Sequence, residues 1–232
     1  MKMLRSGLLI LFLLFAAAGR AQEAVSDFRS WNTFSITKDV NKQFSLGGDV
    51  EMRFSENISR FDLVYLNFNG TYKPAKWLRI GATYRPIFKN KEDNSLGIRH
   101  RFYGDLMFRS KPGRFTLSNR ARLQWEYRTS GYSSRYRGIP EIFLRNKIDI
   151  KYKATDVLTP YIGTELRWQI RDPRAPYNDG FTFERTRLYA GMDYAISDRQ
   201  TIGAYFLRQF EFNVEDPMSL NVIGIEYSIS LD

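Results

Sequence analysis

Cysteine is absent from the 232 residues of this sequence. Its absence excludes disulfide bonds, thiolate catalysis, and zinc or iron–sulfur sites built on cysteine. Histidine is scarce as well, since His100 is the only one in the chain. We expect no metal site and no cofactor.

Long apolar runs are missing beyond the first 21 residues. Within those residues, Lys2 and Arg5 precede an apolar stretch over 7–18, and the small residues Gly19 and Ala21 suit cleavage after Ala21. This stretch is shorter than the ~20 residues that a membrane-spanning helix needs, so we expect removal and not anchoring. The sequence therefore predicts a cleaved signal peptide at 1–21 and one barrel domain at 22–232.

Acidic residues are outnumbered, with 25 Asp and Glu against 35 Lys and Arg and a formal net charge of +10. Nucleic-acid binding usually comes with basic runs or a basic helix, whereas these basic residues are scattered singly through the chain. We therefore expect no nucleic-acid partner. Anionic lipid headgroups or a small anionic solute fit the charge better.

Alternation of apolar and polar residues dominates the chain from residue 28 onward. Between Phe44 and Ser55 every second side chain is apolar or glycine and those between are mostly polar, which is the pattern of a strand with one greasy face. Similar or less regular segments occur at 28–38, 43–55, 61–72, 78–85, 101–109, 115–128, 141–152, 159–171, 183–195, 200–212 and 219–231. They predict an all-β fold, a single antiparallel transmembrane β-barrel of about 10–12 strands.

Connections of two lengths alternate along the chain. Short turns are expected at 73–76, 110–113, 154–156 and 197–200, and longer loops at 88–96, 129–139 and 172–181. Outer-membrane barrels have short periplasmic turns and longer external loops. On that assignment segment 28–38 would start outside, which conflicts with an even-stranded barrel. It could be a plug, an edge strand or no strand at all, and this stays open.

Three features favour enclosure of the polar face and exposure of the apolar face to lipid. About eleven strands around an apolar lumen would enclose a large dry void, whereas about eight strands already leave room for a small ligand. Many segments reach the ~9–11 residues that cross a bilayer. Aromatic residues lie near the segment ends, as interfacial girdles do: Tyr72, Trp77, Tyr84, Trp125, Tyr127, Tyr152, Trp168 and Tyr194.

Arginine pairs two residues apart are the most distinctive pattern, because that spacing puts both guanidiniums on one face of a strand. The lumen-lining candidates are Arg53, Arg79, Arg85, Arg99, Arg101, Arg109, Arg120, Arg122, Arg145, Arg167, Arg185 and Arg187, with the acids Asp49, Glu51, Asp105, Glu126, Glu165 and Asp193. Two interpretations stay open. The lumen is biased toward anions, or Arg–carboxylate pairs fill a narrow barrel.

Catalysis is not expected. His100 shares the face of Phe102 and so points to lipid, and the flanking strands offer Ala82, Tyr84, Leu123 and Trp125 on that face, with no serine. A histidine base beside a nucleophile is thus missing.

Several short motifs resemble a known family. They lie at 27–31, 42–46, 51–54, 59–61, 72–78, 81–85, 99–102 and 120–123, among them Tyr72-Lys73-Pro74-Ala75-Lys76-Trp77-Leu78. With them the chain resembles an uncharacterised bacterial barrel family, domain of unknown function 2490, over nearly all of the mature chain. The resemblance implies an outer-membrane barrel and supplies no activity, so no functional residue is carried over.

Three functions remain as hypotheses for a barrel in the outer membrane of a Gram-negative bacterium. The first is a pore or solute-transport barrel with an arginine-rich, polar lumen. The alternative is a plugged structural or binding barrel that acts through the loops at 129–139 and 172–181. The third is a lipid-modifying enzyme. The sequence predicts no oligomeric state.

Overall fold

Each alternating segment forms a β-strand in the computed structural model, which describes residues 25–174, 180–214 and 216–231. The predicted signal peptide lies outside these residues. The strands are β1 (Val25–Asp39), β2 (Phe44–Ser55), β3 (Arg60–Ala75), β4 (Leu78–Asn90), β5 (Leu96–Ser110), β6 (Phe115–Arg128), β7 (Glu141–Tyr152), β8 (Leu158–Arg171), β9 (Thr182–Ser197), β10 (Gln200–Glu211) and β11 (Met218–Ser230). A short 3-10 turn, η1 (Ser134–Tyr136), lies between β6 and β7. Within the described ranges no helix is long and apolar enough to cross a membrane.

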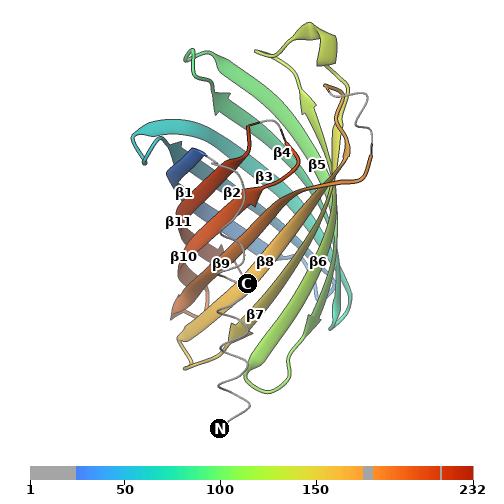
Figure 1. Ribbon diagram of the computed structural model, residues 1–232. Coiled ribbons are helices and arrows are strands. Elements are labelled where there is room, and N and C mark those ends of the chain that lie inside the picture. Colours follow the sequence, from blue (N-terminus) through green and yellow to red (C-terminus); the bar gives the residue numbers. More distant parts are fainter. Residues whose placement is uncertain (1–24, 175–179, 215, 232) are drawn as a thin grey trace.

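The eleven strands close into a barrel, and each pairs with its neighbour in sequence (Figure 1). All of these pairs are antiparallel, and β1 closes the ring by pairing with β11 in parallel, from Val25–Met218 to Thr37–Ser230. An odd number of sequentially connected strands requires one parallel pair, because strand direction alternates around the ring. Segment 28–38, left open by the sequence, is therefore a full strand of the wall.

The two ends of the barrel differ in the length of their connections. One end carries the turns at 40–43, 76–77, 111–114, 153–157 and 198–199, and we call it the short-turn end. The long-loop end carries the β6–β7 connection at 129–140 and those between β8 and β9 and between β10 and β11 (Figure 1). The connection at 91–95 is shorter than predicted because β4 and β5 extend further. Since the strand number is odd, β1 begins at the long-loop end and β11 finishes at the short-turn end.

Polar side chains are enclosed and apolar ones face outward. Among the described residues, fifteen polar or charged side chains are buried against eight hydrophobic ones. In β2, Ser45 and Glu51 are buried, whereas Phe44, Leu46 and Met52 are exposed. The inverted arrangement predicted from the sequence is thus the one that the fold adopts.

A small apolar cluster lies on the inner wall where β10, β11 and β1 meet, formed by Trp31, Leu207, Leu220 and Val222. Tyr205 packs beside it, opposite Gly224, where a Cβ atom would come within 2.0 Å of the tyrosine ring. Tyrosine rings that cover glycines of a neighbouring strand fill the interior at these points.

Aromatic pairs band the outer surface near both ends. At the short-turn end Phe44 contacts Tyr72, and Trp77 stacks on Phe108. At the long-loop end the ring pairs are Phe54–Phe61, Trp168–Phe181 and Phe183–Phe212.

Candidate lumen site

Three cavities follow one another inside the barrel. The long-loop cavity, about 690 Å³, is lined by residues such as Arg99, Glu126 and Glu211. The waist cavity, about 280 Å³, includes Arg145 and Glu165. The short-turn cavity, about 340 Å³, is lined by Thr71, Gly81 and Ser228 among others.

Neighbouring cavities share parts of their walls. The long-loop and waist cavities both touch Trp31, Arg53 and Arg187. The waist and short-turn cavities both touch Tyr65 and Arg85. The polar interior thus consists of three cavities that share lining residues, with the waist cavity between the other two.

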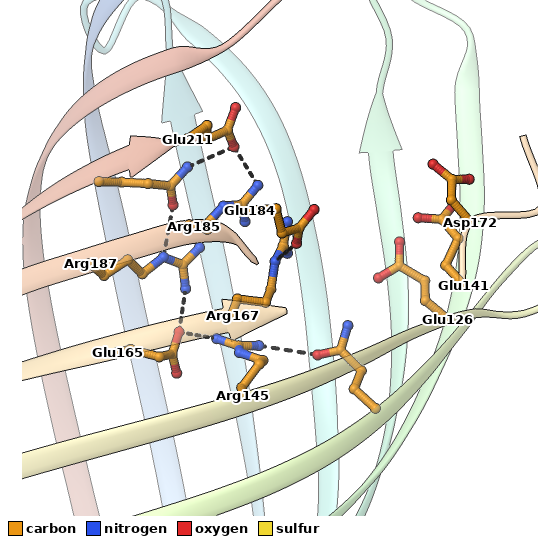
Figure 2. Close-up of polar contacts among 12 residues, drawn as sticks. Glu126, Glu141, Arg145, Glu165, Arg167, Asp172, Glu184, Arg185, Arg187 and Glu211 are labelled. Carbon is orange, nitrogen blue, oxygen red and sulfur yellow. Dashed lines mark hydrogen bonds and ion pairs between the residues drawn. The ribbon is translucent and has the colours of Figure 1, made fainter. Parts of the chain in front are cut away.

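Three arginines converge on one carboxylate at the waist. Glu165 of β8 accepts hydrogen bonds from Arg120 at 2.9 Å, from Arg187 at 3.2 Å and from Arg145. Figure 2 shows Arg145 and Arg187 directed at Glu165 from the strands on either side of it. They meet because inward positions on β6, β7, β8 and β9 are neighbours in the sheet. One negative charge therefore faces three positive ones.

Several donors at the waist have no partner among the described residues. These are the Nε atoms of Arg120 and Arg145 and the Nε2 atom of Gln124. Gln124 is fully buried, and its Oε1 accepts from Arg145 at 3.1 Å. Buried donors normally find an acceptor, so these three are exceptions among the described residues.

A hydrogen-bonded chain leads from the waist to the long-loop cavity. Arg187 donates to Gln209 at 2.8 Å, Gln209 donates to Glu211 at 3.1 Å, and Arg185 also binds Glu211. Beside this chain, Arg167 pairs with Glu184 (Figure 2). The guanidiniums are thus held in fixed positions toward the lumen.

Three further guanidiniums stack on aromatic rings. The guanidinium carbon lies 3.7 Å from the ring centroid in the pairs Arg53–Trp31 and Arg85–Tyr65, and 3.6 Å in Arg122–Tyr103. Stacking on a ring leaves the in-plane N–H groups free for oxygen acceptors. Arg122 uses two of them on Asp105, at 2.7 and 2.8 Å.

The long-loop mouth is tied to the barrel by charged contacts. The ring of Tyr132, from the β6–β7 connection, has Lys91, Arg99 and Arg128 within 5.3 Å, and its hydroxyl accepts from Arg99 at 2.6 Å. This connection therefore rests on the rim.

Arg174, which follows β8, also contacts the rim. It forms ion pairs with Glu141 at 3.3 Å and with Asp172 at 3.0 Å. Burial raises the pKa of Asp172, but hydrogen bonds from Arg174 outweigh burial and set that pKa below its ordinary value. The Asp172–Arg174 link is thus ionic at neutral pH.

The charge of the lining changes along the axis. Ten basic and six acidic side chains line the long-loop cavity, and eight basic and four acidic ones line the waist cavity. The short-turn cavity has three basic and four acidic side chains. Positive charge thus dominates two of the three cavities and reverses at the last.

Fifteen of the eighteen lumen candidates named from the sequence line one of these cavities. Arg79, Arg109 and Asp193 are not among the lining residues, and Asp193 instead accepts from Lys151 at 2.5 Å. The waist brings together Arg53, Arg85, Arg120, Arg122, Arg145, Arg187, Glu51 and Glu165. Asp49 and Asp105 line the short-turn cavity. Arg99, Arg101, Arg167, Arg185 and Glu126 line the long-loop cavity.

Sequence reasoning missed the aromatic and amide members of the site. Tyr103 alternates with apolar neighbours on the same face as Arg101, so its parity was a usable signal. Trp31 lies on the strand whose role was open. Glu184 is the residue left unpaired at a register shift between β8 and β9, which hides its inward direction from simple alternation.

His100 lies on the outer wall, on the face expected from the sequence. Pro86 and Tyr127 stand directly opposite it. Tyr84 reaches it diagonally, and its hydroxyl lies 2.8 Å from Nδ1 of His100. Among the residues with described positions, no three potential metal ligands gather in one place.

Comparisons with known proteins agree with the barrel. The model of a family described as "Protein of unknown function (DUF2490)" matches residues 28–218. No curated protein matches the chain. A solved structure titled "NanC porin structure in rhombohedral crystal form" is similar in fold, with a TM-score of 0.50 and 14% sequence identity. The match covers 84% of this chain and 94% of that porin chain.

Proposed function

Because this chain belongs to the family described as Protein of unknown function (DUF2490), whose description assigns no activity, we propose a function from the barrel itself. In this proposal the protein is an outer-membrane barrel that takes up small anionic solutes through an arginine-rich lumen. The membrane and the solute are argued separately below.

Membrane insertion is supported by the outer surface. Large apolar side chains are exposed on every strand of the barrel, and aromatic pairs band both ends. The strands have 12 to 16 residues, more than the ~9–11 that a tilted strand needs to cross a bilayer. In water this surface would be costly, whereas acyl chains match it. The outer membrane is the bacterial compartment where such barrels reside.

The convergence of Arg120, Arg145 and Arg187 on Glu165 carries the anion proposal. With one carboxylate among three guanidiniums, a second anion at the waist lowers the electrostatic energy. A cation at the same place is repelled. The waist therefore selects by charge.

The reversal of charge at the short-turn end makes the two ends of the path different for an anion. An anion that enters from the long loops is attracted as far as the waist. It must then leave past Asp49, Asp105 and Glu226, which repel it and prevent tight retention. Binding that is favourable enough to enter and weak enough to leave is what conduction requires.

Reversal potentials in planar bilayers test the proposal. With the purified barrel in a KCl gradient, we expect the sign that indicates chloride over potassium. Arg120→Gln and Arg187→Gln should each lower the permeability ratio by roughly twofold, since each removes one charge from the waist. Arg114→Gln, in the exposed turn between β5 and β6, changes the net charge equally and should leave the ratio unchanged. Bilayers that stay silent, or cation preference in the wild type, contradict the proposal.

A closed binding barrel is the second candidate, favoured by the ion pairs that cross the waist and by Tyr132 on the rim. Exchange of 129–139 for a Gly–Ser linker would then abolish complementation of a deletion mutant while the barrel still folds. Complementation by the exchanged protein excludes this candidate.

A further inference from the structure

An arginine interrupts the apolar outer wall near the β1–β11 closure. In β10, Leu207 and Gln209 point inward and are only 5% and 2% exposed, whereas Phe206 between inward positions is 47% exposed. Arg208 shares the direction of Phe206 and is exposed. Its guanidinium therefore lies on the surface that faces lipid under the proposed membrane placement.

Polar side chains of the next strand accompany Arg208. Its Nη1 donates to Oδ1 of Asn221 in β11 at 3.0 Å, and its guanidinium carbon lies 5.2 Å from the centroid of the Phe210 ring. In β1, Asn32 donates to Ser30 at 3.0 Å on the same outward face, because Trp31 between them points inward. We call Arg208, Asn221, Ser30 and Asn32 the seam patch.

The positive charge of the seam patch is not neutralised by the wall. No carboxylate of residues 25–174, 180–214 or 216–231 forms an ion pair with Arg208. A guanidinium has five N–H donors, and the bond to Asn221 uses one of them. The other N–H groups of Arg208 have no acceptor among the described residues, and the Asn221 amide beside them can also donate, which is an arrangement that suits a phosphate oxygen.

The depth of Arg208 fits a headgroup and not the acyl core. Arg208 is three residues before the end of β10, and Asn221 is three residues after the start of β11. At a strand tilt near 40° this is about 8 Å below the long-loop end of the strands. A lipid-facing arginine near the interface costs about 0–1 kcal/mol, against about 2–4 kcal/mol at the midplane.

We propose that Arg208 and Asn221 bind the phosphate of an anionic lipid headgroup in the leaflet that surrounds the long loops. Charge complementarity favours this ligand. Arg208 is a cation without a paired carboxylate, at headgroup depth and beside an apolar surface, which suits a molecule with a phosphate and acyl chains. The site rests on the membrane placement and is independent of passage through the lumen, because Arg208 is outside it.

Native mass spectrometry of the detergent-solubilised barrel tests the site. With phosphatidylglycerol and a neutral galactolipid of the same acyl chains in competition, the wild type should retain phosphatidylglycerol. Arg208→Gln should weaken that retention about tenfold, a difference of about 1.4 kcal/mol, and Asn221→Leu should weaken it less. Lys38→Gln, also outward but near the short-turn end of β1, is the matched control and should retain the lipid normally.

Three outcomes overturn the lipid site: equal retention of both lipids by the wild type, undiminished retention by Arg208→Gln, or a lipid-free dimer that Arg208→Gln dissociates. Inorganic phosphate should compete weakly, because it lacks acyl chains, and full competition at millimolar phosphate would also contradict a lipid site. Chloride selectivity of Arg208→Gln should equal that of the wild type. Silent bilayers with normal lipid retention would reject the pore and leave this site standing.

Discussion

At the scale of single residues, Glu165 holds the waist together. Its side chain is almost fully enclosed and carries the negative charge that Arg120, Arg145 and Arg187 share. The burial of charges is tolerated when they are paired and hydrogen-bonded, and removal of one partner leaves the others uncompensated.

Glu165→Gln should therefore destabilise the barrel by about 3–5 kcal/mol, as the loss of one member of a buried ion pair does. Urea unfolding in detergent micelles, followed by tryptophan fluorescence, measures the change. Glu56→Gln removes a carboxylate that is paired with Arg60 on an exposed turn, and it should cost about 0–1 kcal/mol. Equal effects of the two substitutions would mean that the ion pairs at the waist contribute no more to the free energy of unfolding than an exposed ion pair does.

At the scale of elements, the β2–β3 hairpin contains an unusual turn. Glu56, Asn57 and Ile58 have φ values of 55°, 56° and 69°, which is a run of left-handed backbone without glycine. Asp27 of β1 stabilises the turn, because its carboxylate accepts from the backbone N–H groups of Glu56 and Asn57 at 3.3 and 3.1 Å. The left-handed region costs ordinary residues about 1–2 kcal/mol each.

Ile58→Gly should raise the free energy of unfolding by about 0.5–1 kcal/mol. Glycine relieves the strain at φ 69°, and its greater freedom in the unfolded chain cancels only part of that gain. Ile58→Ala keeps a Cβ atom in the same conformation and should give no gain, which makes it the control in the same unfolding experiment. A loss of stability in the glycine variant would show that the side chain of Ile58 matters more than the backbone.

The alternation of apolar and polar residues predicted most strands, because each strand has one polar face and one apolar face. In β6 the inward series Arg120, Arg122, Gln124 and Glu126 follows from parity alone. Parity fails at register shifts, as between β8 and β9, where Glu184 turns inward beside Arg185. It also cannot give register, so the residues directly opposite His100, Pro86 and Tyr127, came only from the structure.

At the scale of the whole molecule, closure is the feature that local sequence could not supply. The pairing of β1 with β11 joins residues at opposite ends of the chain, and the alternation within 28–38 does not indicate a partner. The parallel direction follows only once all eleven strands are in one ring. The waist depends on this closure too, since the guanidinium carbon of Arg187 in β9 lies 5.2 Å from the ring centroid of Trp31 in β1.

A disulfide can report the closure, because the chain has no cysteine of its own. The hydroxyls of Ser35 in β1 and Ser228 in β11 are 2.9 Å apart inside the barrel. Ser35→Cys with Ser228→Cys should form a disulfide in oxidising buffer, seen as a mobility shift that dithiothreitol reverses. Ser35→Cys with Ser118→Cys, which lies across the barrel on β6, should not. The reverse result would mean that β1 pairs elsewhere.

The most direct test of the enclosed, positively charged lumen is cysteine modification in the reconstituted barrel. Gln169→Cys lies in the wall of the long-loop cavity, and Ile162→Cys lies on the outer face of the same strand. An anionic methanethiosulfonate should label Gln169→Cys faster than a cationic one of similar size, and neither should label Ile162→Cys in the bilayer. Faster labelling by the cationic reagent, or free labelling of Ile162→Cys, would contradict a barrel that encloses its charges and favours anions.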